Sequence, residues 1–228
     1  MTILHIETST NICSVALSNR GKLLFEVFDD QGMNHARLLS PFVDKALTEM
    51  RKQNLTLDAV AVSGGPGSYT GLRIGVSTAK GLCYGYNIPL IAVPTLEVLA
   101  TAGLSVITPE DNALLYPMID ARRMEVYTAE YSPSLRLNGE VTAEIITEDS
   151  FAEQLNEHIC YFVGNGAEKC KSVLTHSNAR FPDNIVLHAK HMITAAEKRF
   201  NHQEFVDVAY YEPFYLKEFV ATIPKKQF

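Results

Sequence analysis

The sequence has no long hydrophobic run, no close cysteine pair and no surplus of basic residues, and each shortage excludes a class of protein. Its longest apolar stretches, 89–93 and 113–119, are far shorter than the ~20 residues that a membrane-spanning helix requires. The amino-terminal residues lack a basic segment and soon reach a carboxylate at Glu7, so we expect no signal peptide and a mature chain that begins at Met1. A cytoplasmic protein with no membrane insertion is expected.

The few cysteines and the acidic balance limit the chemistry further. Cys13, Cys83, Cys160 and Cys170 are far apart and form no C-x-x-C pair, so we predict reduced core residues rather than disulfides or a zinc site. The net charge of −6 and the pI near 5.6 argue against nucleic-acid binding by this chain alone. The acidic excess falls entirely after residue 104, which suggests two lobes, 1–104 and 105–228.

The first half has the pattern of an α/β protein. Short apolar runs at 2–6, 14–17 and 22–28 predict three strands at the start of the chain. From residue 34 to residue 50 the apolar residues instead recur at steps of three and four, which predicts a helix. Pro41 lies within it, so the helix is expected either to begin close to this proline or to kink there.

The apolar side chains of this helix cover about half of its circumference, whereas packing on one surface needs only about 100°. Two interpretations follow. The helix is sandwiched between a sheet and a neighbouring helix, or its excess apolar surface contacts another protein.

A strand at 58–63 is followed by an unusually glycine-rich loop and then by a second helix. The loop candidates are Gly64, Gly65, Pro66, Gly67, Ser68, Thr70 and Gly71, with Ser68 or Thr70 as the helix cap. Within the helix, Gly75 and Gly81 each cost about 1 kcal/mol relative to alanine. We expect this cost to be offset by the close approach of another backbone.

A glycine-rich loop before a helix can bind phosphate. The Walker spacing of Gly, four residues, then Gly-Lys is missing here, and the loop does not follow the first strand of a βαβ unit as the Rossmann pattern requires. Nucleotide binding by this loop alone is therefore disfavoured.

The second half also has an α/β pattern. A hairpin is predicted over 114–120 and 124–130, a further strand over 139–146, a helix over 148–157 and a strand over 159–164. The last strand leads into a tight turn.

Several segments together resemble the bacterial TsaB (YeaZ) family. The most specific segment is 63–75, Ser-Gly-Gly-Pro-Gly-Ser-Tyr-Thr-Gly-Leu-Arg-Ile-Gly, and the opening Ile-Leu-His-Ile-Glu-Thr-Ser-Thr at 3–10 supports it. Ile-Asp-Ala-Arg-Arg at 119–123, Val-Gly-Asn-Gly-Ala at 163–167 and Pro-Phe-Tyr-Leu-Lys at 213–217 follow in the same order. The resemblance covers the whole chain.

The resemblance implies a two-lobed fold of the actin, hexokinase and Hsp70 type in reduced form. It also implies a non-catalytic subunit that supports the paralogous transferase TsaD, together with the ATPase TsaE, in threonylcarbamoylation of the tRNA adenosine beside the anticodon. Pairing would use two first-lobe helices, at about 34–52 and 69–86, with a homodimer forming when the chain is alone. The implied interface residues are Leu38, Leu39, Phe42, Val43, Ala46, Leu47, Met50, Tyr69, Leu72, Arg73, Gly75, Val76, Ala79, Lys80 and Cys83.

The chain lacks the complete phosphate-binding set of a working ATPase of this fold, which places a carboxylate and a glycine in each lobe's first hairpin. Glu7 and Asp120 are carboxylates at those places, but neither turn contains a glycine. We interpret Asp120 as a cap of its turn, and Gly164 and Gly166 as parts of a tight turn. These four residues are candidates only for a vestigial nucleotide site.

No metal site or cofactor is expected. The catalytic paralogue carries two histidines four positions apart in the first helix, whereas here His35 is followed at that spacing by Leu39. His188 and His191 have no further ligand nearby in sequence, so we expect a solvated helix face. Basic residues near the end, Lys217, Lys225 and Lys226, are too few to bind tRNA, although they could steer a complex.

Two functional hypotheses remain open. The first is a scaffold subunit that contacts tRNA only through the complex. The second is an independent ATP-dependent phosphotransferase, with an unfamiliar phosphate site that includes Asp120 and Glu7. Binding of ATP and magnesium to the isolated chain distinguishes them.

Overall fold

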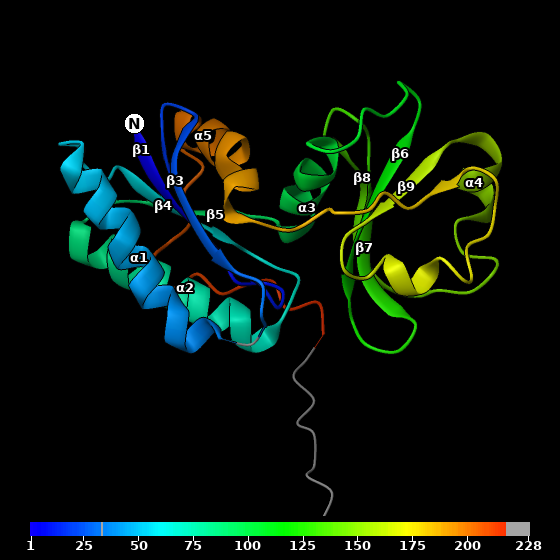
Figure 1. Cartoon of the computed structure of the whole chain (residues 1–228), viewed down its shortest axis with the longest axis horizontal. Helices are drawn as coiled ribbons and strands as arrows, with labels where there is room; N and C mark the ends of the chain where they lie inside the picture. The colour runs from blue at the N-terminus through cyan, green and yellow to red at the C-terminus, as the bar shows by residue number, and fades with distance from the viewer. Residues whose placement is uncertain (33, 218–228) are drawn as a thin grey trace, which may run out of the picture.

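The computed structural model describes residues 1–32 and 34–217, which form two lobes, each built on a five-stranded sheet (Figure 1). The first sheet has the order β3-β2-β1-β4-β5 and the second the order β10-β9-β6-β7-β8. Their strands are β1 Thr2–Glu7, β2 Cys13–Asn19, β3 Lys22–Asp29, β4 Ala59–Ser63, β5 Leu90–Val93, β6 Leu114–Asp120, β7 Glu125–Tyr131, β8 Leu137–Ile145, β9 Cys160–Val163 and β10 Ala179–Arg180. The predicted α/β class and the two-lobed architecture are confirmed.

Helices α1, His35–Lys52, and α2, Tyr69–Tyr86, cover one face of the first sheet. Successive side chains of a strand point to opposite faces, so Leu4 and Ile6 of β1 pack under these helices while Ile3 belongs to the core on the other face. The α1 helix runs through Pro41 and begins six residues before it, so the expectation that it begins close to the proline is wrong.

The remaining helices are α3, Thr95–Leu104, α4, Ala152–Glu157, and α5, Ile193–Asn201, with short 3₁₀ turns η1, Glu168–Cys170, and η2, Ala189–Met192. The helix predicted over 148–157 is therefore too long. Phe151 has a left-handed backbone with φ 60°, and the residues before it form turns instead of the first helical turn.

The lobes do not follow a single cut at residue 104. Helix α3 packs on β6, β7 and β9 of the second sheet, so the chain crosses between lobes just after β5. From η2 onward it returns to the first lobe, where α5 contacts β5 and β1. The second lobe is thus an insertion, and the end of the described chain belongs to the first lobe.

One hydrophobic core spans both lobes. It joins Ile91 and Val93 of the first sheet to Leu96 and Leu99 of α3, and it continues to Leu115 of the second sheet. An interface of this kind, large and apolar, restricts relative motion of two lobes. None of the helices in 1–32 and 34–217 is both long and apolar enough to cross a bilayer.

Residues 205–217, which we call the strap, run back over the first lobe (Figure 1). The strap begins beside β5, where the Val206 N–H donates to the carbonyl of Leu90 at 3.0 Å. It then passes α2, where the Lys80 ammonium donates to the carbonyls of Ala209 at 2.9 Å and Tyr211 at 3.1 Å. The strap therefore packs along β5 and α2 of the first lobe.

Candidate functional site

β1 and β4 run parallel in the first sheet, as β6 and β9 do in the second, so the carboxyl ends of each pair lie at one edge of the sheet, which is where open α/β sheets bind ligands. Every sequence-based candidate for a vestigial nucleotide site lies at one of these two edges. Each of them is hydrogen-bonded to, or closely packed against, other residues of this chain.

Glu7, at the end of β1, is completely buried and turns toward its own lobe. Its carboxylate accepts hydrogen bonds from the Ser63 hydroxyl at 2.5 Å and from the Ser9 backbone N–H at 2.7 Å. Burial raises the pKa of this carboxyl, and the two serines oppose that shift. Glu7 therefore ties β1 to β4 and does not reach the space between the lobes.

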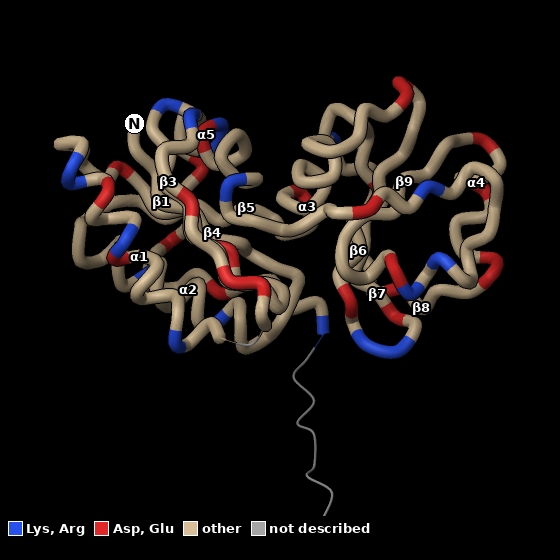
Figure 2. Tube along the Cα trace, viewed as in Figure 1, with Lys and Arg blue, Asp and Glu red and all other residues tan. Residues whose placement is uncertain are grey.

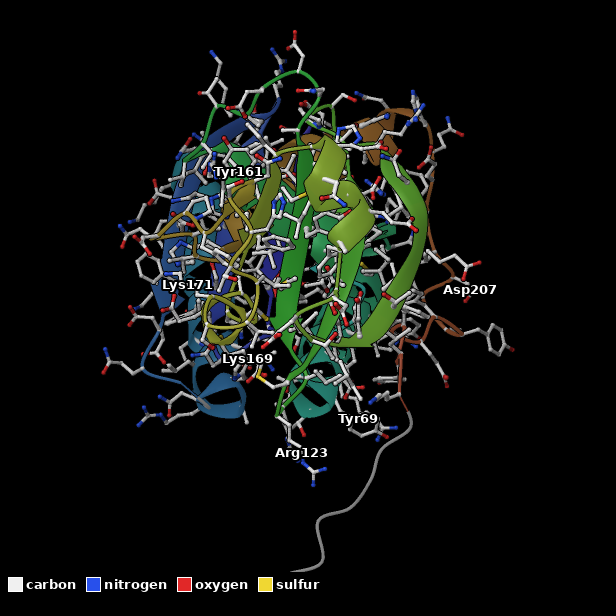
Figure 3. All side chains as sticks on the ribbon, turned by 90° about the vertical axis from the view of Figure 1, so that its right-hand side faces the viewer. Tyr69, Arg123, Tyr161, Lys169, Lys171 and Asp207 are labelled. Carbon is white, nitrogen blue, oxygen red and sulfur yellow. The ribbon has the colours of Figure 1, made fainter. Side chains whose placement is uncertain are left out.

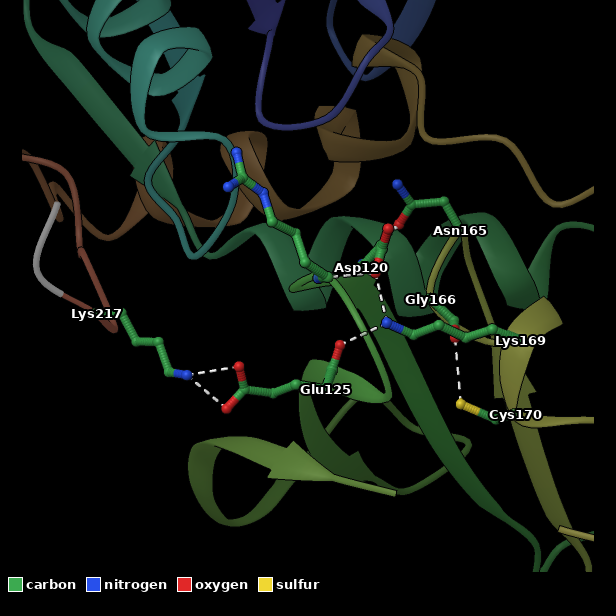
Figure 4. A network of polar contacts seen from close by, with 8 residues as sticks. Asp120, Glu125, Asn165, Gly166, Lys169, Cys170 and Lys217 are labelled. Carbon is green, nitrogen blue, oxygen red and sulfur yellow. Dashed lines mark hydrogen bonds and ion pairs between the residues drawn. The ribbon is translucent and has the colours of Figure 1, made fainter. Parts of the chain in front are cut away.

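Asp120, at the end of β6, is neutralised by Lys169, whose ammonium lies 2.5 Å from its carboxylate (Figure 4). The Arg122 N–H donates to the same carboxylate at 2.9 Å, which is the turn-capping role predicted for this aspartate. The Lys169 ammonium also donates to the Glu125 carbonyl at 2.6 Å. Sequence reasoning missed Lys169, because nothing in its spacing links it to Asp120.

Gly164 and Gly166 form the tight turn predicted after β9. Gly164 has φ +106°, and a Cβ there would lie 2.6 Å from the Met118 carbonyl oxygen. A Cβ at Gly166 would lie 2.9 Å from the Ile119 carbonyl carbon. Both glycines are thus required by the close passage of β6, without any ligand.

The glycine-rich loop is packed from two sides. Toward the β1–β2 turn, a Cβ at Gly67 would lie 2.5 Å from the Ser9 carbonyl oxygen, and one at Gly71 would overlap the carbonyl oxygen of Thr8. Ser68 caps α2, since its hydroxyl accepts from the Gly71 N–H at 3.2 Å, whereas Thr70 is exposed. Pro66 is buried within the loop.

The strap covers the other side of this loop. The Phe214 N–H donates to the Gly64 carbonyl at 2.7 Å, and a Cβ at Gly65 would overlap the Phe214 carbonyl oxygen. Beyond this point, Lys217 forms a two-oxygen ion pair with Glu125 of β7 at 2.5 Å. The strap therefore passes from the glycine-rich loop of one lobe to the hairpin of the other (Figure 4).

Arg73 and two tyrosines hold the strap to the start of α2. The Arg73 guanidinium lies 4.3 Å from the ring centre of Tyr69, and its Nε donates to the Tyr215 hydroxyl at 3.4 Å. The rings of Tyr69 and Tyr215 are 4.8 Å apart. Two residues assigned to the partner interface thus also serve the chain's own fold.

Most residues assigned to that interface are buried inside the first lobe. These residues form one core with the sheet, and they are Leu39, Phe42, Val43, Ala46, Leu47, Met50, Val76, Ala79 and Cys83, while Leu72 and Gly75 are buried beside them. The sandwiched-helix interpretation is therefore right, and the apolar arc of α1 is not surplus. Leu38, Tyr69 and Lys80 are half-buried, and Arg73 is exposed.

The two helical glycines differ. A Cβ at Gly75 would overlap the side-chain hydroxyl of Thr8, so the close neighbour is a side chain of this chain's own β1–β2 turn and not the backbone that was expected. A Cβ at Gly81 would meet nothing within 4 Å. The outer face of α2, with Ser77 and Tyr84 exposed on either side of Gly81, is open.

Within 1–32 and 34–217, no three His, Cys, Asp or Glu side chains are arranged so that they could hold a metal ion. His188 is only 9% exposed and stacks on Phe28 at 4.2 Å, so the expected solvated face is wrong. Burial lowers the pKa of His191 to about 4. All four cysteines are free and buried, as predicted.

Basic residues are scattered among acidic ones along the chain in both lobes (Figure 2). Arg123, at the β6–β7 turn, points away from the protein (Figure 3). The predicted steering residues Lys225 and Lys226 lie outside the described residues.

Comparison with known proteins places this geometry in a family. The family model TsaD, described as tRNA N6-adenosine threonylcarbamoyltransferase, matches residues 29–225. The tRNA threonylcarbamoyladenosine biosynthesis protein TsaB of Escherichia coli is 32% identical, with 100% of both chains covered. The TsaB of Bacillus subtilis is 38% identical over 58% of this chain and 55% of its own length.

A solved structure titled YeaZ from Pseudomonas aeruginosa is 26% identical, with a TM-score of 0.75 over 94% of this chain and 99% of that one. Another from the same organism, titled as an uncharacterized protein with similarity to peptidase YEAZ, is also 26% identical, with a TM-score of 0.81 over 95% of this chain and 99% of that one. Sequence and fold agree over nearly the whole length. The chain therefore belongs to the TsaB (YeaZ) family, within the broader TsaD family whose model spans most of it.

Proposed function

We propose that this chain acts in the biosynthesis of tRNA threonylcarbamoyladenosine as a non-catalytic subunit that binds and supports a TsaD-type transferase. The names of its full-length relatives give the pathway. The main observation in favour of a non-catalytic role is the position of the strap. It packs against the glycine-rich loop of the first lobe and ends at Glu125 of the second lobe. The Asp120–Lys169 ion pair and the inward-facing Glu7 support the same reading.

The transferase would bind the outer faces of α1 and α2. The buried residues of these helices stabilise the lobe, so binding falls to exposed positions such as Ser40 and Lys45 on α1 and Arg73, Ser77 and Gly81 on α2. The open face around Gly81 leaves room for another helix to approach closely. The same faces would pair two copies of this chain when the transferase is absent.

The wider assembly follows from this role. TsaE would join the pair, and tRNA would be contacted through the complex, since the basic residues in the described part of the chain are dispersed. The chain alone would need no cofactor. The alternative, an independent ATP-dependent phosphotransferase, requires Asp120 and Glu7 to leave their present partners.

The test uses Ser77→Arg, with Ser172→Arg as its matched control, because both serines are exposed and only Ser77 lies on α2. Mixing each variant with the catalytic paralogue, followed by light scattering and quantification of threonylcarbamoyladenosine in tRNA, is expected to show lost pairing and lost modification for Ser77→Arg alone. Equal activity of both variants would refute the interface.

Substitutions at Leu39, Val43 or Gly75 are unsuitable for this test, because these buried residues would disrupt the lobe itself. A separate titration of the isolated chain with ATP and magnesium addresses catalysis. Saturable binding at millimolar nucleotide would favour the phosphotransferase.

A further inference from the structure

A polar pocket of about 240 Å³ lies on the second lobe, lined by residues of β6, β7, β8 and α4. Glu140, Thr142 and Glu144 occupy alternate positions of β8 and line it together, since alternate residues of a strand share one face. Thr128 of β7, the register partner of Thr142, lies beside them. Figure 3 views the molecule from the second-lobe side, where α4 lies in front of part of the sheet.

The Thr128 side chain is the first sign that this pocket receives a ligand. Thr128 is only 2% exposed, and its hydroxyl has no hydrogen-bond partner within the described chain. Leaving a buried hydroxyl unpaired costs about 1–3 kcal/mol, and native proteins rarely accept this without a reason. A ligand that donates to this oxygen would remove the cost.

The carboxylates are the second sign. Glu130 is already satisfied, because the Tyr116 hydroxyl donates to it at 2.6 Å and the Asn138 amide at 3.1 Å. Glu140 and Glu144 form no ion pair with any residue in 1–32 or 34–217, although Ser150 forms a side-chain hydrogen bond with Glu144. Glu144 is half-buried, and burial raises its pKa. A positive charge in the pocket would compensate both carboxylates.

The aromatic wall distinguishes an organic cation from a metal ion. Phe151 is half-buried and lines the same pocket, and Tyr116, which is only 3% exposed, packs against it with the ring centres 4.6 Å apart. Aromatic faces combined with carboxylates attract ammonium groups, whereas Mg²⁺ requires a near-octahedral set of oxygen ligands. No such metal-binding cluster exists among the described side chains.

We propose that this pocket binds a small organic cation through a primary ammonium group, with Glu140, Glu144 and Thr128 as hydrogen-bond acceptors and Tyr116 and Phe151 as the apolar wall. An ammonium group has three N–H donors, which matches three acceptors on one face of the sheet. The proposal is independent of partner binding by α1 and α2.

The experiment titrates the full chain by NMR and calorimetry with 1,4-diaminobutane, n-butylammonium and 1-butanol. Both amines are expected to saturate the pocket in the millimolar range or below, and the uncharged alcohol is not. Tighter binding of the diamine assigns a polyamine-like ligand, and equal binding of both amines assigns a single ammonium group, as on a lysine side chain.

Glu144→Gln should weaken binding about tenfold, since a charge-assisted hydrogen bond is lost. Its control is Glu148→Gln, an exposed glutamate that does not line the pocket.

Thr128→Val gives a second, independent readout. It should weaken amine binding about threefold to tenfold, while the melting temperature of the free protein stays equal or rises, because an unpaired buried hydroxyl is removed. Absence of saturable amine binding up to 10 mM (roughly the weakest affinity expected of one such pocket) would overturn the proposal. So would equal competition by Mg²⁺, or an equal loss of binding in Glu148→Gln.

Discussion

The carbonyl oxygen of Phe214 occupies the space that a side chain at position 65 would need, so Gly65 and the strap are fitted to each other. Gly65 also has φ +102°, a conformation that other residues adopt at a cost of about 1–3 kcal/mol. Position 65 therefore requires glycine for two reasons: its backbone conformation and the space that the Phe214 carbonyl occupies.

Gly65→Ala is therefore expected to release the strap and to lower the free energy of unfolding by about 2 kcal/mol or more. Hydrogen exchange should show faster exchange at the Phe214 N–H, which donates to Gly64. Gly139→Ala is the matched control, because Gly139 also has positive φ but has no atom within 4 Å of a Cβ. Equal destabilisation without faster strap exchange would contradict the fit.

The two glycines inside α2 should respond in opposite directions to the same substitution. Gly75→Ala places a methyl group against Thr8 and is expected to destabilise the chain, whereas Gly81→Ala gains up to about 1 kcal/mol of helix propensity without a clash. Urea unfolding of the two variants measures both effects. If Gly81→Ala strengthens the fold but weakens pairing with the transferase, the open face of α2 is part of the interface.

Stability should fall as the pH falls below about 6.5, because buried histidines are held neutral. Burial lowers the pKa of His5 to about 3, with the ring within 2.8 Å of the Ser18 hydroxyl. The unfolded state therefore binds a proton that the folded state refuses, so stability is present above the unfolded pKa and is lost as the pH falls toward 3.

The contribution of His5 between pH 6.5 and 5 is about 2 kcal/mol. His5→Gln should reduce the difference in unfolding free energy between these two pH values by about that amount. Urea titrations of both proteins at each pH give this difference. Parallel pH dependence in the variant and the parent chain would show that His5 is not the group responsible. Glu7, whose raised pKa gives the opposite trend above its unfolded value, is present in both proteins and cancels.

Lys169→Gln should lower stability only slightly, by less than about 1 kcal/mol, because Asp120 is 46% exposed and water screens the ion pair. The variant should still fail to bind ATP with magnesium in calorimetry, since Glu7 stays turned inward and the strap stays in place. Binding by the variant but not by the parent chain would mean that this ion pair alone closes the site.

The sequence predicted the strands of the first half and the glycine-rich turn well, because short apolar runs and glycines carry strong local signals. It could not show which surface covers the apolar arc of α1, because the period of a helix gives the width of an apolar face but not its partner. The structure assigns that face to Leu4, Ile6 and the rest of the first sheet.

The sequence also could not predict contacts between residues that lie far apart along the chain. Lys169 meets Asp120 across 49 positions, and Phe214 meets Gly64 across the whole insertion of the second lobe. The density of glycines did indicate that something passes close to the loop. Only the fold shows that it is the chain's own strap.

The core shared through α3 has a mechanical consequence. Many two-domain proteins close around a ligand by a hinge motion, whereas here Leu96 and Leu99 pack in a core that both lobes share. A molecule docked on α1 and α2 would therefore also fix the position of the second sheet, because the shared core keeps the two lobes in one relative orientation.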